Sequence, residues 1–199
     1  MIVIIDYGAG NLFSVQNALN YLGFDNKISR DRAEIEVADG LILPGVGAFP
    51  DAMEMLRSTG LVETVRAEAD KKPFLGICLG MQMLFDESYE FRHEKGLGLI
   101  SGKVDLIRCP YKIPHMGWNH LAMNGNSPLL KGVAEGSSVY FVHSYMAYTD
   151  RRNVSAYCDY GAEIPALVER GHVFGAQFHP EKSGAAGLKI LENFGGLTR

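Results

Sequence analysis

The sequence predicts an α/β fold, a three-layer sandwich with a largely parallel central sheet. Two observations support this prediction. In the first half of the chain, short apolar runs alternate with segments of helical periodicity, which is typical of a parallel sheet covered by helices on both faces. In the second half, strand-like runs follow one another with little helix between them. These later runs are expected to be antiparallel additions to the sheet.

The first half of the chain begins with a strand and a helix. Residues 1–6 form an apolar strand, and Leu12 opens a helix with Asn11 at its capping position. Gly60 breaks a longer helical stretch, and Gly80 is the last breaker before a helix that continues to Phe85. The helical face after residue 11 consists of Leu12, Val15, Leu19 and Leu22. The remaining expected elements are strands at 24–28, 40–43 and 74–77 and the broken helix at 51–70.

The second half begins with strands and ends with a helix. Ser183 stands before the last helix, in which Gly187, Ile190, Leu191 and Phe194 share one face. The expected strands are 103–107, 139–142, 154–158, 166–169 and 172–178. A flavodoxin-like sandwich follows, with its functional site at the carboxyl ends of the parallel strands.

Composition sets further bounds. With 199 residues, 47% of them hydrophobic, and no Ser/Pro/Gly-rich linker, the chain is expected to form one domain over residues 1–199. A net charge of −4 without a basic cluster argues against nucleic acid as a partner. Met1 is followed directly by strand-like residues, and no apolar run approaches membrane-spanning length, so a cytoplasmic location without membrane contact is expected.

The three cysteines, Cys78, Cys109 and Cys158, are too scattered for a disulfide framework or a zinc site. His93, His115, His120 and His172 also lack paired ligand spacing, so no metal is expected, and no cofactor is expected either.

Cys78 is the candidate nucleophile. It follows the apolar strand at 74–77 and precedes a helix, and Gly76 and Gly80 flank it at the spacing of a nucleophile elbow. Glycines allow a sharp turn without Cβ clashes, and the positive end of the next helix favours a thiolate. Most free cysteines are buried and structural, but packing alone does not require the two glycines.

His179 and Glu181 are the candidate base and its orienting group. The strand-like run 173–178 ends just before His179, and Pro180 stops it. Two residues apart on extended backbone, both side chains leave the same face, so Glu181 can bond one imidazole nitrogen while the other faces Cys78. A His-x-Glu pair by itself is more often a surface feature.

The loop Gly45-Val46-Gly47 could form a simple strand-to-helix turn. Because its strand is expected beside the elbow strand, the amides of the loop, Val46 and Gly47 above all, can together with the Leu79 amide form an oxyanion hole. Gln82 lies four residues after Cys78, where its amide could bind a substrate or satisfy interior backbone.

These segments resemble the class I (triad) glutamine amidotransferases. The resemblance covers residues 2–194, with no departure at a triad position, and is nearest to the glutaminase subunits of histidine biosynthesis. The matching segments are IDYGAGNL at 5–12, LPGVGAF at 43–49, GICLGMQ at 76–82, HMGWN at 115–119, FVHSY at 141–145 and HPEKS at 179–183. The substrate-binding residues that it implies are Gly45, Gln82, His143, Ser144 and Tyr145.

The resemblance implies hydrolysis of glutamine to glutamate and ammonia through a γ-glutamyl thioester. It also implies a heterodimer with a (β/α)8-barrel cyclase that consumes the ammonia and yields imidazole glycerol phosphate and an aminoimidazole carboxamide ribonucleotide. The candidate interface residues are Asn11, Trp118, Tyr140 and Lys182. Two alternatives stay open: the glutaminase subunit of another amidotransferase, such as anthranilate synthase, and a stand-alone γ-glutamyl cysteine hydrolase.

Overall fold

The computed structural model describes all residues from 1 to 199. Its helices are α1 Leu12–Tyr21, α2 Arg32–Val37, α3 Phe49–Ser58, α4 Val62–Ala69, α5 Leu79–Gln82 and α6 Gly184–Gly196, with 3-10 turns η1 Pro128–Leu130, η2 Arg151–Asn153 and η3 Pro180–Lys182. Its strands are β1 Ile2–Ile5, β2 Asn26–Ser29, β3 Gly40–Gly45, β4 Phe74–Cys78, β5 Phe85–Ser88, β6 Glu94–Lys95, β7 Ile100–Leu106, β8 His115–His120, β9 Ala122–Met123, β10 Ser138–His143, β11 Tyr145–Thr149, β12 Val154–Asp159, β13 Glu163–Arg170 and β14 Val173–Ala176.

The central sheet has eight strands in the order β2-β1-β3-β4-β14-β13-β12-β9. The first five are parallel to one another, and β13, β12 and β9 extend the sheet by antiparallel pairing. Register places Gly45 of β3 opposite Cys78 of β4, and Ala176 of β14 opposite Ile77. The predicted mixed α/β architecture is therefore confirmed, with β4 near the middle of the sheet.

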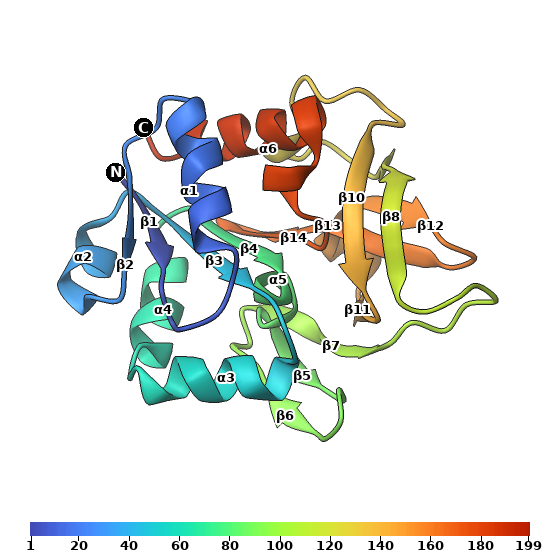
Figure 1. Cartoon of the computed structure of the whole chain (residues 1–199), viewed down its shortest axis with the longest axis horizontal. Coiled ribbons are helices and arrows are strands. Elements are labelled where there is room, and N and C mark those ends of the chain that lie inside the picture. Colours follow the sequence, from blue (N-terminus) through green and yellow to red (C-terminus); the bar gives the residue numbers. More distant parts are fainter.

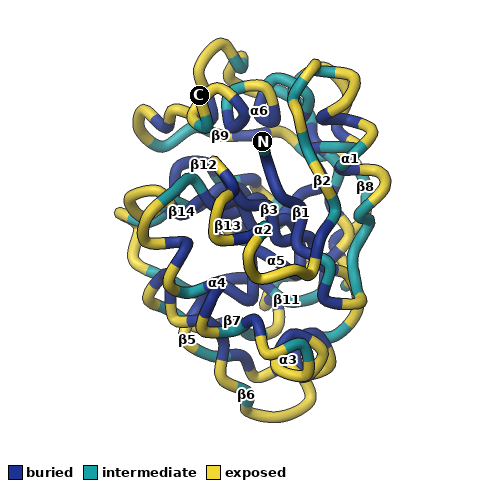
Figure 2. Tube along the Cα trace, turned by 90° about the vertical axis from the view of Figure 1, so that its left-hand side faces the viewer, coloured by how far each residue is buried: buried dark blue, intermediate teal, exposed yellow.

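Helices cover both faces of this sheet (Figure 1). Helices α1 and α6 lie on one side, and α3 and α4 lie on the other. The alternating side chains of β1 divide accordingly: Ile2 and Ile4 join the core under α1 and α6, whereas Val3 and Ile5 join the core over α3 and α4. Figure 2 shows the buried strands running between exposed outer turns.

Not all later strands extend the central sheet, so that part of the prediction is wrong. Strand β7 belongs to a four-stranded sheet in the order β11-β7-β5-β6, and β10 pairs with β8 in a separate two-stranded sheet. The last strand, β14, is parallel to β4 and antiparallel to β13. The two smaller sheets stand beside the carboxyl end of β4, where they form a wall around it.

Three local predictions also need correction. The helix after Cys78 does not reach Phe85, because α5 ends at Gln82 and Phe85 pairs with Ile100 in the four-stranded sheet. Asn11 makes no side-chain cap for α1, although its carbonyl accepts the amides of Ser14 and Val15. The Ser183 hydroxyl does not cap α6 either, because it is bonded to other groups.

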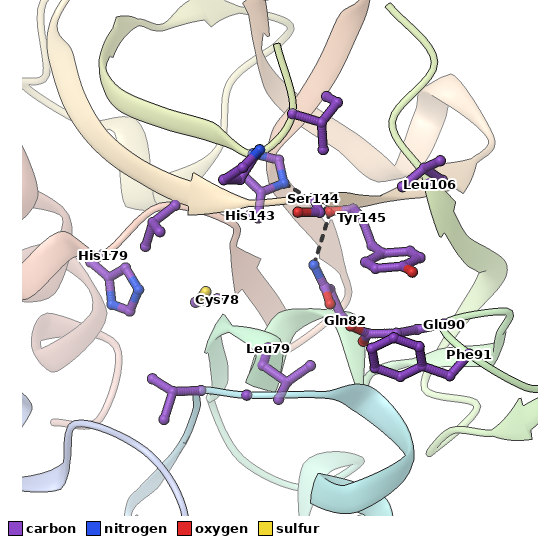
Figure 3. A pocket seen from close by; sticks show the side chains of 15 residues that line it. Cys78, Leu79, Gln82, Glu90, Phe91, Leu106, His143, Ser144, Tyr145 and His179 are labelled. Atoms are coloured by element: carbon purple, nitrogen blue, oxygen red, sulfur yellow. Dashed lines mark hydrogen bonds between the residues drawn. The ribbon is translucent and has the colours of Figure 1, made fainter.

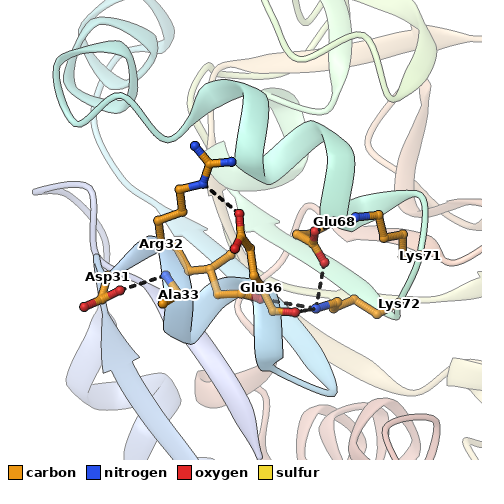
Figure 4. A network of polar contacts seen from close by, with 8 residues as sticks. Asp31, Arg32, Ala33, Glu36, Glu68, Lys71 and Lys72 are labelled. Atoms are coloured by element: carbon orange, nitrogen blue, oxygen red, sulfur yellow. Dashed lines mark hydrogen bonds and ion pairs between the residues drawn. The ribbon is translucent and has the colours of Figure 1, made fainter.

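A polar network joins α2 to the end of α4, away from the carboxyl end of β4 (Figure 4). Lys72 donates to the carbonyls of Ile35 and Glu36 at 3.2 and 2.7 Å, and it pairs with Glu68 at 2.8 Å. Asp31 caps α2 by accepting from the Ala33 amide. The Lys72 side chain is only 12% exposed, so it links the two helices from a largely buried position.

No helix of the chain is long and apolar enough to cross a membrane.

Candidate active site

Cys78 lies where β4 ends and α5 begins. Its backbone has φ 55° and ψ −112°, a conformation that residues with a Cβ rarely adopt. Such strain persists only where surrounding structure imposes it, and it is concentrated at functional sites. The side chain is a free thiol on the wall of a pocket and is 7% exposed. The predicted elbow is thus present in the backbone geometry.

The glycines of the elbow are required by close backbone approach. A Cβ on Gly80 would lie 1.8 Å from the carbonyl oxygen of Leu43, and one on Gly76 would lie 2.6 Å from the carbonyl oxygen of Gly80. These contacts pack the single turn of α5 directly against β3 and β4. Because α5 has only four residues, its dipole is smaller than a longer helix would provide.

His179 and Glu181 form a buried pair. The imidazole Nδ1 lies 2.8 Å from Glu181 Oε1, and the two side chains are 3% and 0% exposed. The backbone that joins them is not extended as predicted, because Pro180 begins the 3-10 turn η3. The turn brings the carboxylate within hydrogen-bond distance of the ring nitrogen. The second oxygen, Glu181 Oε2, is buried without a hydrogen-bond partner.

The electrostatics of His179 reflect both neighbours. Burial lowers its pKa, but hydrogen bonds with Cys78 and Glu181, together with their charges, raise the pKa from 6.5 to about 9. At neutral pH this imidazole therefore carries a proton and lies beside a sulfur and a carboxylate. A Cys-His-Glu arrangement of this kind can activate a nucleophile and hold an imidazolium in one orientation.

The backbone of His179 is fastened to β10. Its amide donates to the Tyr140 carbonyl at 3.0 Å, and its carbonyl accepts from the Ser183 hydroxyl at 2.6 Å. The same hydroxyl accepts from the Tyr140 amide at 3.0 Å. Ser183 therefore closes a ring of hydrogen bonds around the base rather than capping α6.

A pocket of about 570 Å³ opens beside Cys78 and His179 (Figure 3). Its volume suits a small molecule such as an amino acid. The remaining wall residues come from α5, from the two smaller sheets and from loops, namely Val46, Gly47, Leu79, Gln82, Glu90, Phe91, Leu106, Ile113, Pro114, Val142, His143, Ser144 and Tyr145.

The predicted oxyanion residues Val46, Gly47 and Leu79 all lie on this wall, next to Cys78. Gly47 has φ +95° and Val46 is 41% exposed, so this loop is free to present amides to the pocket. Gly45 is not a wall residue. It is buried in β3, where an added Cβ would lie 2.6 Å from the Gly80 amide nitrogen.

The predicted substrate-binding residues Gln82, His143, Ser144 and Tyr145 also line the pocket. The Gln82 amide, however, is used within the protein: Nε2 donates to the Tyr145 carbonyl and to Gln177 Oε1, both at 3.0 Å. The side chain of His143 is likewise bonded to the Tyr145 carbonyl. Substrate binding by the Gln82 amide, and by the backbone of the segment from His143 to Tyr145, stays a prediction.

Sequence reasoning missed Glu90. This wall residue is 8% exposed, and its Oε2 accepts from the Phe49 amide at 2.8 Å. Burial raises the pKa of Glu90, an effect that the Phe49 amide partly opposes. A buried carboxylate on a pocket wall can pair with an ammonium group. No spacing pattern marks Glu90 in the sequence, because it lies in a loop between two short strands.

The four candidate interface residues differ in exposure. Trp118 is 60% exposed and packs edge to face against the half-buried Tyr140, with ring centroids 6.0 Å apart. Lys182 is exposed on η3, and Asn11 is half-buried just before α1, which packs against η3. All four remain accessible to a partner.

Comparison with known proteins assigns this architecture to a class. The family described as glutamine amidotransferase class-I matches residues 3–195. A crystal structure of a glutamine amidotransferase aligns over 100% of this chain and 99% of its own, with a TM-score of 0.78 and 21% identity. The structure of PurLQS from Thermotoga maritima aligns over 97% of this chain and 96% of its own, with a TM-score of 0.75 and 21% identity. The chain belongs to the class-I glutamine amidotransferases.

Within that class, curated relatives are similar over the full length. The imidazole glycerol phosphate synthase subunit HisH of Bacillus cereus strain G9842 is 52% identical over 199 residues, covering 100% of this chain and 95% of the relative. The HisH subunit of Caldanaerobacter subterraneus is 51% identical over 201 residues, covering 100% and 99%. The particular family is thus that of the HisH subunits of imidazole glycerol phosphate synthase.

Proposed function

We propose that this chain hydrolyses glutamine and that Cys78, His179 and Glu181 carry out the reaction. The observation that supports this most is the arrangement of the three groups. A cysteine in strained backbone lies on the wall of a pocket of about 570 Å³, beside a histidine whose Nδ1 is 2.8 Å from a buried carboxylate. No other cysteine of the chain lines this pocket.

The Cys78 sulfur attacks the side-chain amide carbon of glutamine and forms a tetrahedral intermediate. His179, protonated at neutral pH, donates a proton to the departing nitrogen, which leaves as ammonia while the γ-glutamyl thioester remains. His179, now neutral, takes a proton from water, and the resulting hydroxide displaces the thiolate to give glutamate. Glu181 stabilises the imidazolium and holds its Nδ1 proton throughout.

Charge develops on the carbonyl oxygen of glutamine during both steps. The Leu79 amide and the amides of Val46 and Gly47 lie around this part of the wall and would donate to that oxygen. Gly47 can turn its peptide without a steric penalty, since nothing lies within 4 Å of its Cβ position and its φ is already positive.

The far end of the pocket would bind the amino-acid end of glutamine. Glu90 provides a buried carboxylate for the α-ammonium group, and the segment of Ser144 and Tyr145 provides backbone groups opposite. Gln82 orients the Tyr145 carbonyl from the other side of this segment. The substrate is then fixed at both ends, which positions its amide carbon at Cys78.

The ammonia would pass to a second polypeptide, a (β/α)8-barrel cyclase that forms a heterodimer with this chain in histidine biosynthesis. Relatives that are about half identical over the full length are named as subunits of imidazole glycerol phosphate synthase, which supports such a partner. Asn11, Trp118, Tyr140 and Lys182 form our proposed docking face. We place the reaction in the cytoplasm, where a reducing environment keeps Cys78 a free thiol.

A glutaminase assay tests this proposal. The purified chain is assayed alone and with the cyclase subunit of a HisH relative's enzyme and its nucleotide ligand, and glutamate release is measured. Cys78→Ser is expected to abolish release, whereas Cys109→Ser, a matched change of a half-buried cysteine outside the pocket, is expected to keep it. Turnover by Cys78→Ser at the wild-type rate would rule out the mechanism, and loss in both variants would rule out a specific role for Cys78.

A further inference from the structure

A directional chain of hydrogen bonds runs from β8 to the proposed glutamine pocket. Asn119 Nδ2 lies 3.3 Å from His115 Nε2, and His115 Nδ1 lies 2.9 Å from His143 Nε2. His143 Nδ1 in turn lies 2.8 Å from the Tyr145 carbonyl oxygen. His115 is placed to reach His143 because the antiparallel register of β8 and β10 pairs these two residues directly.

The Asn119 amide at one end of this chain and the Tyr145 carbonyl at the other determine which ring nitrogens of His115 and His143 carry protons. A carbonyl oxygen only accepts, so His143 must carry its proton on Nδ1 and leave Nε2 bare. His115 must then donate from its own Nδ1, which leaves its Nε2 free to accept from the Asn119 amide. Both rings are therefore neutral Nδ1–H tautomers, and every polar atom of the two rings is satisfied.

The surroundings keep this histidine pair neutral. His115 is 2% exposed and His143 is 6% exposed. His115 is stacked between Phe141, at 4.6 Å between centroids, and Tyr160, at 4.1 Å. Burial lowers the pKa of His115 to about 4 and, as the largest effect, lowers that of His143 to about 3. Neither ring is placed to exchange protons at neutral pH.

The far end of the chain is a single carbonyl that receives two donors. The Tyr145 oxygen accepts from His143 and, from the opposite side, from Gln82 Nε2 at 3.0 Å (Figure 3). Both donors line the pocket, and Gln82 also bonds Gln177, whose amide nitrogen lies 4.0 Å from the Cys78 sulfur. The orientation of this peptide therefore depends on which nitrogen of His143 carries the proton.

We propose that His115 is a positioning residue for glutamine: it holds His143 in the Nδ1–H tautomer and thereby fixes the Tyr145 carbonyl and the Gln82 amide on the pocket wall. His115 is not itself a wall residue. This inference rests on the proposed function, since the pocket it shapes is taken to bind glutamine. It assigns a role to His115, which is distant from Cys78 in the sequence.

Three variants of the chain, each assayed in complex with the cyclase subunit, test the proposal. His115→Phe keeps an aromatic ring between Phe141 and Tyr160 but removes the donor to His143. It is expected to raise the KM for glutamine by roughly tenfold, the effect of one buried hydrogen bond, with a smaller change in kcat. His115→Gln restores a donor and is expected to return KM most of the way. Tyr160→Phe, the packing control, is expected to leave KM unchanged.

Imidazole nitrogen chemical shifts, measured on the wild-type chain, test the tautomers without relying on the folding of any variant. They are expected to show His143 and His115 protonated at Nδ1 and unprotonated at Nε2. A His143 protonated at Nε2, a wild-type KM in His115→Phe, or equal losses in the Phe and Gln variants would each overturn the inference. A wild-type chain that releases no glutamate in the complex would instead count against the proposed function.

Discussion

Gly80 is the position at which the elbow is most sensitive to an added atom. It lies in α5, two residues after Cys78, and it packs against the end of β3. In Gly80→Ala the new Cβ would lie 1.8 Å from the Leu43 carbonyl oxygen and 3.2 Å from the Pro44 carbonyl carbon. Both obstacles are backbone atoms, so no side-chain rotation relieves the overlap. Either α5 or the β3 end must move.

Two opposing effects set the change in the free energy of unfolding of Gly80→Ala. Adding atoms to a well-packed interior costs about 1–3 kcal/mol where neighbouring side chains can move aside. Because the overlap here is with backbone atoms, a cost of about 3 kcal/mol or more is expected. Replacing glycine by alanine within a helix gains about 1 kcal/mol. The expected net loss is at least about 2 kcal/mol in the free energy of unfolding. Glutaminase kcat is also expected to fall, because α5 begins with Leu79 and β3 leads into the Val46–Gly47 loop, so a shift of either element displaces a proposed oxyanion amide.

Urea unfolding and glutaminase kinetics measure these two effects, with Gly196→Ala as the matched control. Gly196 ends α6, and nothing lies within 4 Å of its Cβ position. Its replacement is expected to leave the free energy of unfolding unchanged or to raise it by up to about 1 kcal/mol. A Gly80→Ala chain with the urea midpoint and kcat of the wild type would refute the packing argument for the elbow.

Substitutions at five further positions give testable predictions. Glu181→Gln removes a charge that stabilises the imidazolium, so the pKa of His179 falls from about 9 and the alkaline limb of the pH profile of kcat moves to lower pH. His179→Ala, by contrast, is expected to lose nearly all turnover. An alkaline limb at the wild-type pH in Glu181→Gln would contradict this prediction. Glu90→Gln is expected to raise the KM for glutamine by roughly tenfold with a smaller change in kcat, because a charge-assisted hydrogen bond to the ammonium is lost; an unchanged KM contradicts it. Lys182→Ala is expected to keep hydrolysis but to raise the ratio of glutamate released to cyclised product, measured against a reaction fed with ammonium; the wild-type ratio would exclude Lys182 from the interface role. Lys72→Met is expected to lower the free energy of unfolding by about 2 kcal/mol without altering glutaminase kinetics, since it leaves Glu68 with Lys71 alone; an equal urea midpoint would contradict it.

Local patterns predicted most of the parallel half of the fold, although helix α2 at Arg32–Val37 was not expected. Strands β1, β3 and β4 are short, largely apolar runs, whereas β2 is mostly polar and begins two residues later than predicted. The elbow is marked by glycines at Gly76 and Gly80, where the backbone approaches closely. The break near Gly60 is also confirmed, since α3 ends at Ser58 and α4 begins at Val62. The strand patterns and the helix break depend on neighbours in sequence, and the glycine spacing of the elbow is a local motif, which is why the sequence alone reveals them.

The remaining features depend on contacts between distant residues. Whether a strand joins the central sheet or a smaller one is decided by pairing, and β10 pairs with β8 rather than with a neighbour of β4. His115 meets His143 only through that register, and Glu90 reaches the pocket through a loop. No periodicity or ligand spacing in the sequence marks either contact. The predicted cap of α6 was wrong for a related reason, because the Ser183 hydroxyl is hydrogen-bonded to the backbone of His179 and Tyr140 instead.

The two-stranded sheet of β8 and β10 has two faces with different uses. One face carries the buried His115 and His143, whereas the other, outer face carries Trp118 and Tyr140. The backbone of Tyr140 is also bonded to His179, directly and through Ser183. A protein that docks on the outer face therefore contacts the same strand that fixes the base and one wall of the pocket. Any displacement of β10 on docking would move both His179 and this wall of the pocket, because backbone hydrogen bonds rather than flexible side chains connect β10 to them.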